Sequence, residues 1–315
     1  MKVLVFGNAN ADINVSPVNR LDSMMDLIYV DDIDLYSGGN AMTTSIVLKK
    51  LGVDCTLATY VGGADDIFSS FLMRQLNEVG VDTSLITAVE GETCGIVIVM
   101  VNDNGKRSFL YKSGVQNQMI LDQHVLDKVS DYDVVSINGT FHMPKFDGVG
   151  TKILLEAAKA KGKITAMDIT PDMTGQWLNT IGQALPYCDY FIPSYLEASA
   201  MTGENEVEAM AEILLSKGVS TVIIKLDKNG CYYDDKKSKG IVPAFPIKAI
   251  NTTGAGDSFC AGFISTLGNE MHLVERLKFA NAVAALSCLG MGAVGTITDK
   301  KGVDLFIEKF NHMNR

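Results

Sequence analysis

Residues 251 to 263 combine small residues with one acid in a pattern that could transfer a phosphoryl group. The segment reads Asn-Thr-Thr-Gly-Ala-Gly-Asp-Ser-Phe-Cys-Ala-Gly-Phe and places Asp257 in the first turn of an expected helix. N–H groups at a helix start have no partner within the helix and lie at the positive end of its dipole, so they can bind phosphate. Here they belong to Gly254, Ala255 and Gly256. Asp257 could accept the proton of an alcohol that attacks the phosphorus.

Polar residues near the N-terminus could bind that alcohol. Asp12 can accept two hydroxyl hydrogen bonds, and Asn10 and Asn40 can each donate and accept. Simpler explanations exist for isolated residues: Asp12 could be an ordinary turn residue after a strand, and Asp257 could only stabilise the helix dipole. The choice depends on the elements around them.

The elements that must position these residues follow α/β order. Short apolar runs typical of strands alternate with helical patterns, which indicates a doubly wound, mostly parallel sheet. The expected strands are Val3–Gly7, Cys55–Val61, Asp133–Asn138, Lys163–Asp168, Tyr187–Ile192 and Thr221–Leu226, and the expected helices cover about 65–79, 148–161, 194–202 and 205–217. With 315 residues, the chain fits one large α/β domain over 1–315.

Two segments break this alternation and predict a small antiparallel flap. Strands over 93–100 and 107–112 flank Asn102-Asp103-Asn104-Gly105, a strong hairpin signal, and residues 27–36 alternate weakly. We expect a lid of strands from about 13–37 and 91–113 that closes over a substrate. Its exposed edges could also pair two subunits into a homodimer.

The composition excludes several classes of function. The chain has 27 Lys and Arg against 37 Asp and Glu, so its net charge of −10 gives no overall attraction to nucleic acid or an anionic membrane. No apolar run approaches the roughly 20 residues of a membrane helix. The six cysteines form no Cys-x-x-Cys pair and the N-terminus lacks a secretory signal, so we expect reduced thiols and a cytoplasmic protein.

Two separated motifs resemble those of the ribokinase-like, or PfkB, carbohydrate kinases. Residues 251–263 are similar to the family's C-terminal signature almost residue for residue, and Ser37-Gly38-Gly39-Asn40-Ala41 resembles its diglycine sugar-binding turn. Asn10-Ala11-Asp12 is similar to its sugar-hydroxyl contact, and the order of elements agrees along the whole chain. The resemblance implies a ribokinase-like three-layer α/β/α fold with a mostly parallel central sheet and a small β-flap lid.

The resemblance also implies the reaction: ATP-dependent phosphorylation of a primary hydroxyl of a small sugar or sugar-like alcohol, with Mg²⁺. Asp257 would be the general base and the turn 254–256 the anion hole. The implied sugar contacts are Asn10, Asp12, Gly38, Gly39, Asn40 and Thr43. The family usually has Asn where Thr43 stands, and its ribose-specific members have Lys where Asn40 stands. Ribose would therefore not be held in the usual way.

The implied nucleotide site includes residues 222–230, which resemble the family's nucleotide-contact loop and contribute Lys225, Asp227, Lys228 and Gly230. The family usually has Gly where Asp227 stands. Because an acid repels phosphates, we expect Asp227 to face the ribose or solvent, with Lys225 or Lys228 offsetting its charge. Asn281 would lie near the adenine, or would satisfy a hydrogen bond in the core.

The implied metal sites depart from the family pattern. Glu197 lies in a segment that resembles the Asn-x-x-Glu motif, with Ser194 in place of the Asn, and would organise Mg²⁺ through water or only stabilise a helix start. A monovalent cation such as K⁺ would lie at Asn251 and Thr253. The family has Asp where Asn251 stands, and the missing charge argues against K⁺ activation.

Two other functions stay open at this point. A nucleoside kinase on the same fold would use Asp12 and the diglycine turn to hold a ribose ring. A sugar- or nucleotide-sensing relative that has lost turnover would explain the departures at Ser194, Asp227 and Asn251.

Overall fold

A nine-stranded sheet forms the centre of the computed structural model, which describes residues 1–19, 27–103 and 107–313. In spatial order the strands are β13 (Lys239–Val242), β12 (Cys231–Asp234), β11 (Thr221–Lys225), β10 (Tyr190–Phe191), β9 (Ile164–Ile169), β8 (Val134–Thr140), β1 (Lys2–Gly7), β4 (Asp54–Gly62) and β5 (Asp82–Val89). All neighbours from β11 to β5 are parallel, and only β12 and β13 are added antiparallel. The sheet is therefore mostly parallel, as predicted.

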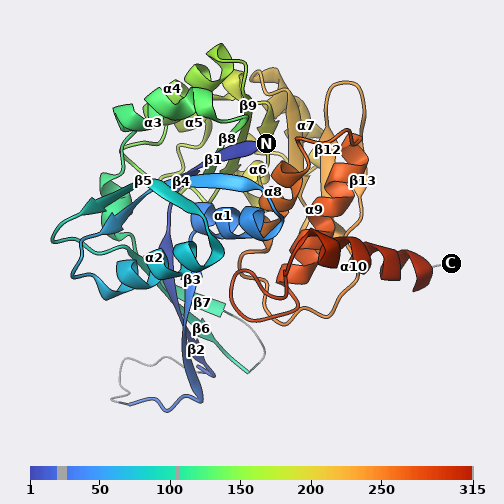
Figure 1. Cartoon of the computed structure of the whole chain (residues 1–315). Helices are drawn as coiled ribbons and strands as arrows, with labels where there is room; N and C mark the ends of the chain where they lie inside the picture. Colours follow the sequence, from blue (N-terminus) through green and yellow to red (C-terminus); the bar gives the residue numbers. More distant parts are fainter. Residues whose placement is uncertain (20–26, 104–106, 314–315) are drawn as a thin grey trace.

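Helices cover both faces of this sheet (Figure 1). One face carries α1 (Asn40–Lys50), α2 (Ile67–Val79), α8 (Ala255–Ser265), α9 (Leu273–Ser287) and α10 (Lys300–Met313), and the other carries α3 (Gln123–Lys128), α4 (Val149–Ala160), α5 (Leu178–Ile181), α6 (Tyr195–Thr202) and α7 (Val207–Ser216). The side chains of β1 alternate between the two cores: Val3 and Val5 pack with the first group, Leu4 and Phe6 with the second. A strand buried on both faces reads as a continuous apolar run.

A second sheet of four strands extends from the main body (Figure 1). Its order is β3 (Asp32–Gly38), β2 (Asn10–Ser16), β6 (Gly95–Val101) and β7 (Arg107–Lys112). The sequence predicted an antiparallel flap, but β2 and β6 run parallel, so this sheet is mixed. The predicted hairpin turn lies in part outside the described residues, since Asn104 and Gly105 are not among them.

Side chains alternate between the two faces of this small sheet. One row across all four strands consists of Tyr36, Asp12, Val97 and Tyr111. The adjacent row, on the opposite face, consists of Leu35, Ile13, Ile98 and Leu110. One face therefore carries the predicted sugar contact Asp12, and the other is apolar.

Several predicted boundaries differ from the structure. The expected strand 187–192 is reduced to β10, because the short 3₁₀ turn η3 (Leu185–Tyr187) precedes it and Pro186 fits the start of a helical turn. The strand β5 and the helix α10 were not predicted. All six cysteines are free and buried. In the described part of the chain, every helix is too short or too polar to cross a membrane.

Candidate active site

The candidate site lies at the carboxyl ends of the central strands, where open α/β sheets bind ligands. In the main sheet, β4 lies on one side of β1, and β8, which comes later in the chain, lies on the other side. The strand order therefore reverses between β1 and β8. The helices α1 and α8 both begin at this edge. Their first turns are in direct contact, since the Asn40 amide donates a hydrogen bond to the Asp257 carboxylate. Residues 217 positions apart in the sequence thus meet at one point.

The diglycine turn allows the start of α1 to approach β2. A methyl group on Gly38 would collide with the carboxylate of Asp12. Gly39 has φ of 89°, and a methyl group there would lie 2.8 Å from Cα of Ala9. Only glycine fits this backbone conformation and this spacing. The structure therefore brings Gly38, Gly39 and Asp12 together, and Thr43 lies buried one turn further along α1.

Asp257 is placed to accept a proton near neutral pH. It is partly exposed in the first turn of α8, and its Oδ1 accepts a 2.8 Å hydrogen bond from Nδ2 of Asn40. Loss of solvation and the nearby carboxylate of Asp168 raise the pKa of Asp257 to about 7, against the opposing effects of Lys225 and Asn40. A base with a pKa near the working pH is the most effective kind.

Three buried oxygens without partners belong to residues in or directly after the small sheet. They are Oδ1 of Asn10, Oδ1 of Asp12 and Oε1 of Gln116. Desolvation and the charge of Asp257 raise the pKa of Asp12 to about 7. Buried acceptors rarely stay unpaired in proteins, because each costs on the order of 1–3 kcal/mol. A ligand rich in O–H donors would satisfy them.

Gln116 was not predicted from the sequence. It lies in the 3₁₀ segment η1 (Gly114–Gln118), which follows β7, and its Nε2 donates to the carbonyl of Ala9 at 2.5 Å. A methyl group on Gly95 would collide with Oδ1 of Asn10 and would lie 2.9 Å from Oε1 of Gln116. The two unpaired oxygens of Asn10 and Gln116 therefore lie close together beside Gly95. No local pattern marks a glutamine for this position.

A buried ion pair lies beneath the start of α8. Lys225, at the end of β11, pairs with Asp168, at the end of β9. A methyl group added to Gly256 would lie 3.4 Å from the Lys225 ammonium, so this ammonium is close to the first turn of α8. Desolvation lowers the pKa of Lys225, but the carboxylates of Asp168 and Glu197 raise it by more. The pKa is therefore raised overall, and the ammonium stays charged. Lys225 is therefore engaged by Asp168, which leaves Lys228 as the other residue expected to offset the charge of Asp227. Asp168 is a site residue that the sequence analysis missed.

The turn 254–256 forms the start of α8, as predicted, with Gly254 as the residue before the helix. The N–H of Ala255 already donates to the carbonyl of Thr252 at 3.3 Å, so this group is partly engaged within the turn. The N-terminal end of α8 and the nearby Lys225 both favour an anion. This region could therefore hold a transferring phosphoryl group.

The predicted nucleotide residues follow β11. Asp227 and Lys228 are exposed in the 3₁₀ turn η4 (Asp227–Asn229), and the buried Gly230 comes next, against the carbonyl of Val242. Asp227 is thus exposed, which fits both expected orientations, towards the ribose or towards solvent. Asn281 is buried, and its Nδ2 donates to the carbonyls of Val242 and Pro243 at 3.1 and 3.2 Å. Its amide is used for a core hydrogen bond, the alternative that the sequence left open.

The predicted metal residues are partly occupied by local contacts. The N–H of Ser194 donates to Oε2 of Glu197 at 2.6 Å in a capping box, and Oδ1 of Asn251 accepts from the N–H of Thr253 at 2.8 Å. Desolvation raises the pKa of Glu197, with Lys225 opposing. In the ranges that the structure describes, no three metal-binding side chains form a cluster. Mg²⁺ usually keeps several waters and binds substrate phosphates with only one or two carboxylates. A single carboxylate such as Glu197 would suit an ion held in this way.

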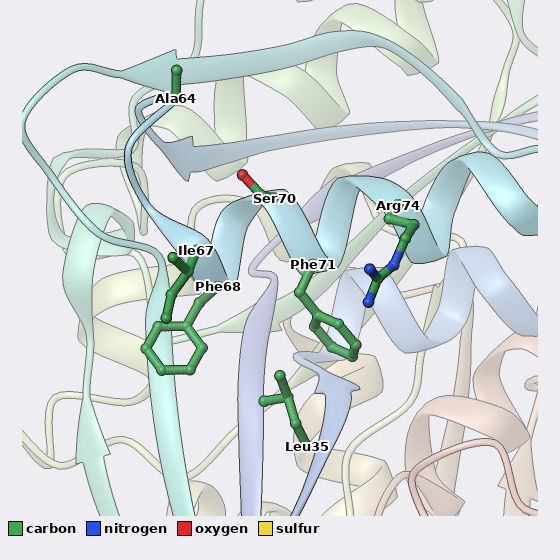
Figure 2. A pocket seen from close by; sticks show the side chains of 7 residues that line it. All are labelled: Leu35, Ala64, Ile67, Phe68, Ser70, Phe71 and Arg74. Atoms are coloured by element: carbon green, nitrogen blue, oxygen red, sulfur yellow. The ribbon is translucent and has the colours of Figure 1, made fainter.

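A surface pocket of about 380 Å³ lies between the small sheet and α2, on the face away from Asp12 (Figure 2). Figure 2 shows Leu35 of β3 directed towards Phe71 of α2. The remaining lining residues are Ala64, Ile67, Phe68, Ser70 and Arg74. No carboxylate lines this pocket, so it is distinct from the Asp257 site.

Comparisons with known proteins agree with this geometry. Residues 1–300 match the family described as pfkB family carbohydrate kinase. A ribokinase of Staphylococcus aureus is 26% identical over 305 residues, which are 94% of this chain and 96% of the relative. A solved Arabidopsis thaliana ribokinase complexed with ribose and ATP has a TM-score of 0.84 and 23% identity, covering 97% of this chain and 98% of its own. A solved Escherichia coli protein, a ribokinase II by its description, in complex with ATP and Mg²⁺ has a TM-score of 0.82 and 22% identity over 98% and 99% of the two chains.

Proposed function

The chain belongs to the pfkB family of carbohydrate kinases, and from this premise we propose that it transfers the γ-phosphoryl group of ATP to a primary hydroxyl of a small sugar or sugar-like alcohol. One observation carries the proposal. A carboxylate whose pKa is raised to about 7 lies at a helix start, near Asp12, one of a group of residues with buried, unpaired acceptor oxygens. A base, an anion site and a polyol site thus adjoin one another.

The proposed reaction uses the residues of this chain as follows. Asn10, Asp12 and Gln116 accept hydrogen bonds from hydroxyl groups and orient the sugar. Asp257 removes the proton of the reacting hydroxyl as its oxygen forms a bond to the γ-phosphorus and the bond from phosphorus to the leaving ADP breaks. The N-terminal end of α8 stabilises the charge of the transferring group. Mg²⁺ bound with ATP would neutralise phosphate charge, with Glu197 holding its water.

The small sheet is proposed to act as a lid on this site. Its face with Asp12 also carries Tyr36 and Tyr111, at the two edges of the sheet. A methyl group on Gly292 would lie 2.8 Å from the Tyr36 ring, so Tyr36 touches the loop that follows α9. Tyr111 stacks on His142, which follows β8. The lid therefore contacts the main body on both sides of Asp12.

The other face of the small sheet supports the proposal of a homodimer. Leu35 is 39% exposed, Leu110 52% and Ile33 66%, so apolar side chains of both edge strands lie open to solvent. A second copy could cover them. Light scattering of the wild type and of Leu110→Glu tests this: a dimer that becomes a monomer supports the proposal, and a monomeric wild type contradicts it. The free buried cysteines fit a reducing compartment, and we propose the cytoplasm.

The experiment that tests the function is ADP release from ATP and Mg²⁺ with a panel of acceptors. The panel contains D-ribose, 2-deoxy-D-ribose, D-fructose, D-glucose, adenosine and uridine. We expect sugar-dependent ADP release, with the phosphate on a primary carbon as seen by ³¹P and ¹³C NMR. Turnover with nucleosides alone would instead indicate a nucleoside kinase. Binding of ATP and sugar without turnover would indicate a sensing protein.

A further inference from the structure

We propose that His142 is a substrate-binding residue of the acceptor site, which donates a hydrogen bond from Nε2 to an oxygen of the sugar. The inference rests on the proposed function, since it adds a donor to the sugar pocket of that reaction. Three features of the structure fix the position of His142: the backbone conformation of the turn before it, a hydrogen bond to Asn8 and a ring stack with Tyr111.

The turn that carries His142 is strained in a way typical of functional sites. It follows β8 at the carboxyl edge of the sheet, where Phe141 adopts φ of 80°, a left-handed conformation that is unfavourable for a bulky side chain. The N–H of His142 donates to the carbonyl of Gly139 at 3.1 Å. A methyl group on Gly139 would collide with Oδ1 of Asn8, so the backbone here closely approaches the Asn8 side chain. The turn is thus fitted to bring His142 towards Asn8.

Asn8 determines which ring nitrogen of His142 carries the proton. Oδ1 of Asn8 accepts the N–H of Asn40 at 3.1 Å, so Nδ2 of Asn8 is the atom that faces Nδ1 of His142 at 3.4 Å. An amide NH₂ group only donates, and therefore Nδ1 must accept. The proton of the neutral ring then lies on Nε2. Burial lowers the pKa of His142, which also favours the neutral ring.

The same contacts connect His142 to the proposed catalytic residues. Asn40, which donates its N–H to Asn8, also donates its side-chain NH₂ to Asp257 at 2.8 Å. The chain of contacts from His142 through Asn8 and Asn40 thus ends at the proposed base. The ring of Tyr111 stacks on His142 with 5.2 Å between centroids and 25° between planes. Burial, and then the charge of Asp12, raise the pKa of Tyr111, so this stack lies close to the sugar contact.

The chemistry of the pocket indicates what His142 would bind. The unpaired oxygens of Asn10 and Gln116 are acceptors and bind only O–H or N–H donors, and Asp12 does the same when its carboxyl is ionised. Among the described residues, Nε2 of His142 has no hydrogen-bond partner in the protein. Its N–H would complete the site by binding an oxygen that only accepts, such as a ring, carbonyl or carboxylate oxygen. The site would then recognise a sugar by several hydroxyl donors and one acceptor oxygen.

Three substitutions separate the hydrogen bond from simple packing. His142→Gln keeps an NH₂ group near the position of Nε2, His142→Asn keeps only a group near Nδ1, and His142→Phe keeps the ring that stacks on Tyr111. His124→Asn, on the exposed surface of α3, is the control. The measurements are KM for sugar and for ATP, together with calorimetric binding of the sugar without ATP. The probe is the panel sugar with the highest kcat/KM or, if none reacts, the one that binds most tightly.

We expect His142→Asn and His142→Phe to weaken sugar binding about 3- to 10-fold, the value of one neutral hydrogen bond, with KM for ATP unchanged. His142→Gln should stay within about 2-fold of the wild type. Sugar binding that survives in His142→Phe, or falls equally in all three variants, overturns the proposal, because packing alone then explains His142. If the wild type binds a sugar but phosphorylates none, the proposed function fails while the binding series still decides the role of His142. If the wild type binds no panel sugar, both fail.

Discussion

Replacement of Asn40 by alanine tests whether the structure sets the basicity of Asp257. Asn40 donates a hydrogen bond of 2.8 Å to Oδ1 of Asp257, and this bond stabilises the charged carboxylate. Its removal should therefore raise the pKa of Asp257 above the value of about 7. A base with a higher pKa is protonated over a wider range, so the acid limb of the kcat/KM profile should move to higher pH.

The size of the shift follows from the strength of the bond. A hydrogen bond to a charged group contributes roughly 1.5–3 kcal/mol, and one pKa unit corresponds to about 1.36 kcal/mol. Because Asp257 is partly exposed, solvent screening favours the lower end, a shift of about one unit. At pH 7 a base of pKa ~7 is half ionised and one of pKa ~8 is about one-tenth ionised. Protonation alone should then reduce kcat/KM at pH 7 about 5-fold, with recovery near pH 9.

The assay is kcat/KM for the sugar from pH 5.5 to 9.5, coupled to ADP release, for the wild type and Asn40→Ala. Thr44→Val is the matched control, since the Thr44 hydroxyl contacts the backbone carbonyl of Asp257, at 3.4 Å, and the Asn138 amide, at 3.3 Å, but makes no hydrogen bond with the Asp257 carboxylate. Its acid limb should coincide with that of the wild type. An acid limb that stays in place in Asn40→Ala, or moves to lower pH, would refute the claim that Asn40 stabilises the charged form of Asp257.

Two further substitutions test the sugar pocket. Burial raises the pKa of Asp12 from 3.8 to about 7, so the folded state loses stability as pH rises from about 4 to 7, and Asp12→Asn should be the more stable protein at pH 8, by up to roughly 4 kcal/mol. Denaturant unfolding at pH 4.5 and 8 checks this, and the same stability difference at both pH values contradicts it. Gly38→Ala places a methyl group against the Asp12 carboxylate and should weaken calorimetric sugar binding at least ~10-fold, with ATP binding unchanged. Gly240→Ala, whose methyl group meets only the Tyr233 ring at 3.7 Å, is the control, and equal sugar affinity in the two variants would count against the diglycine argument.

Local chemistry made part of this site predictable. A helix start with small residues predicts an anion site from a single segment, although the helix dipole alone could also explain Asp257. The alternation of strand and helix patterns likewise predicted the mostly parallel sheet, because each strand buried on both faces is continuously apolar, as β1 is. The diglycine turn at Gly38 was also found locally, although the reason for it, the approach of Asp12, is visible only in the fold.

Contacts between distant residues could not be predicted. Lys225 lies near Asp227 in the sequence, yet it pairs with Asp168, 57 residues away, because β9 and β11 end at the same edge of the sheet. Asn8 and His142 are 134 residues apart and meet for a similar reason, since β1 and β8 are neighbours. Strand order determines such pairs, and the apolar pattern of a strand does not specify its neighbour.

The central claim is that Asp257 is the base that activates the sugar hydroxyl. Its most direct test is single-turnover phosphoryl transfer by Asp257→Asn, with sugar and ATP binding measured in parallel by calorimetry. We predict a rate about 10²- to 10⁴-fold below that of the wild type, the usual contribution of a general base, with both ligands still bound. A folded Asp257→Asn protein that transfers phosphate within a few-fold of the wild-type rate would contradict the claim.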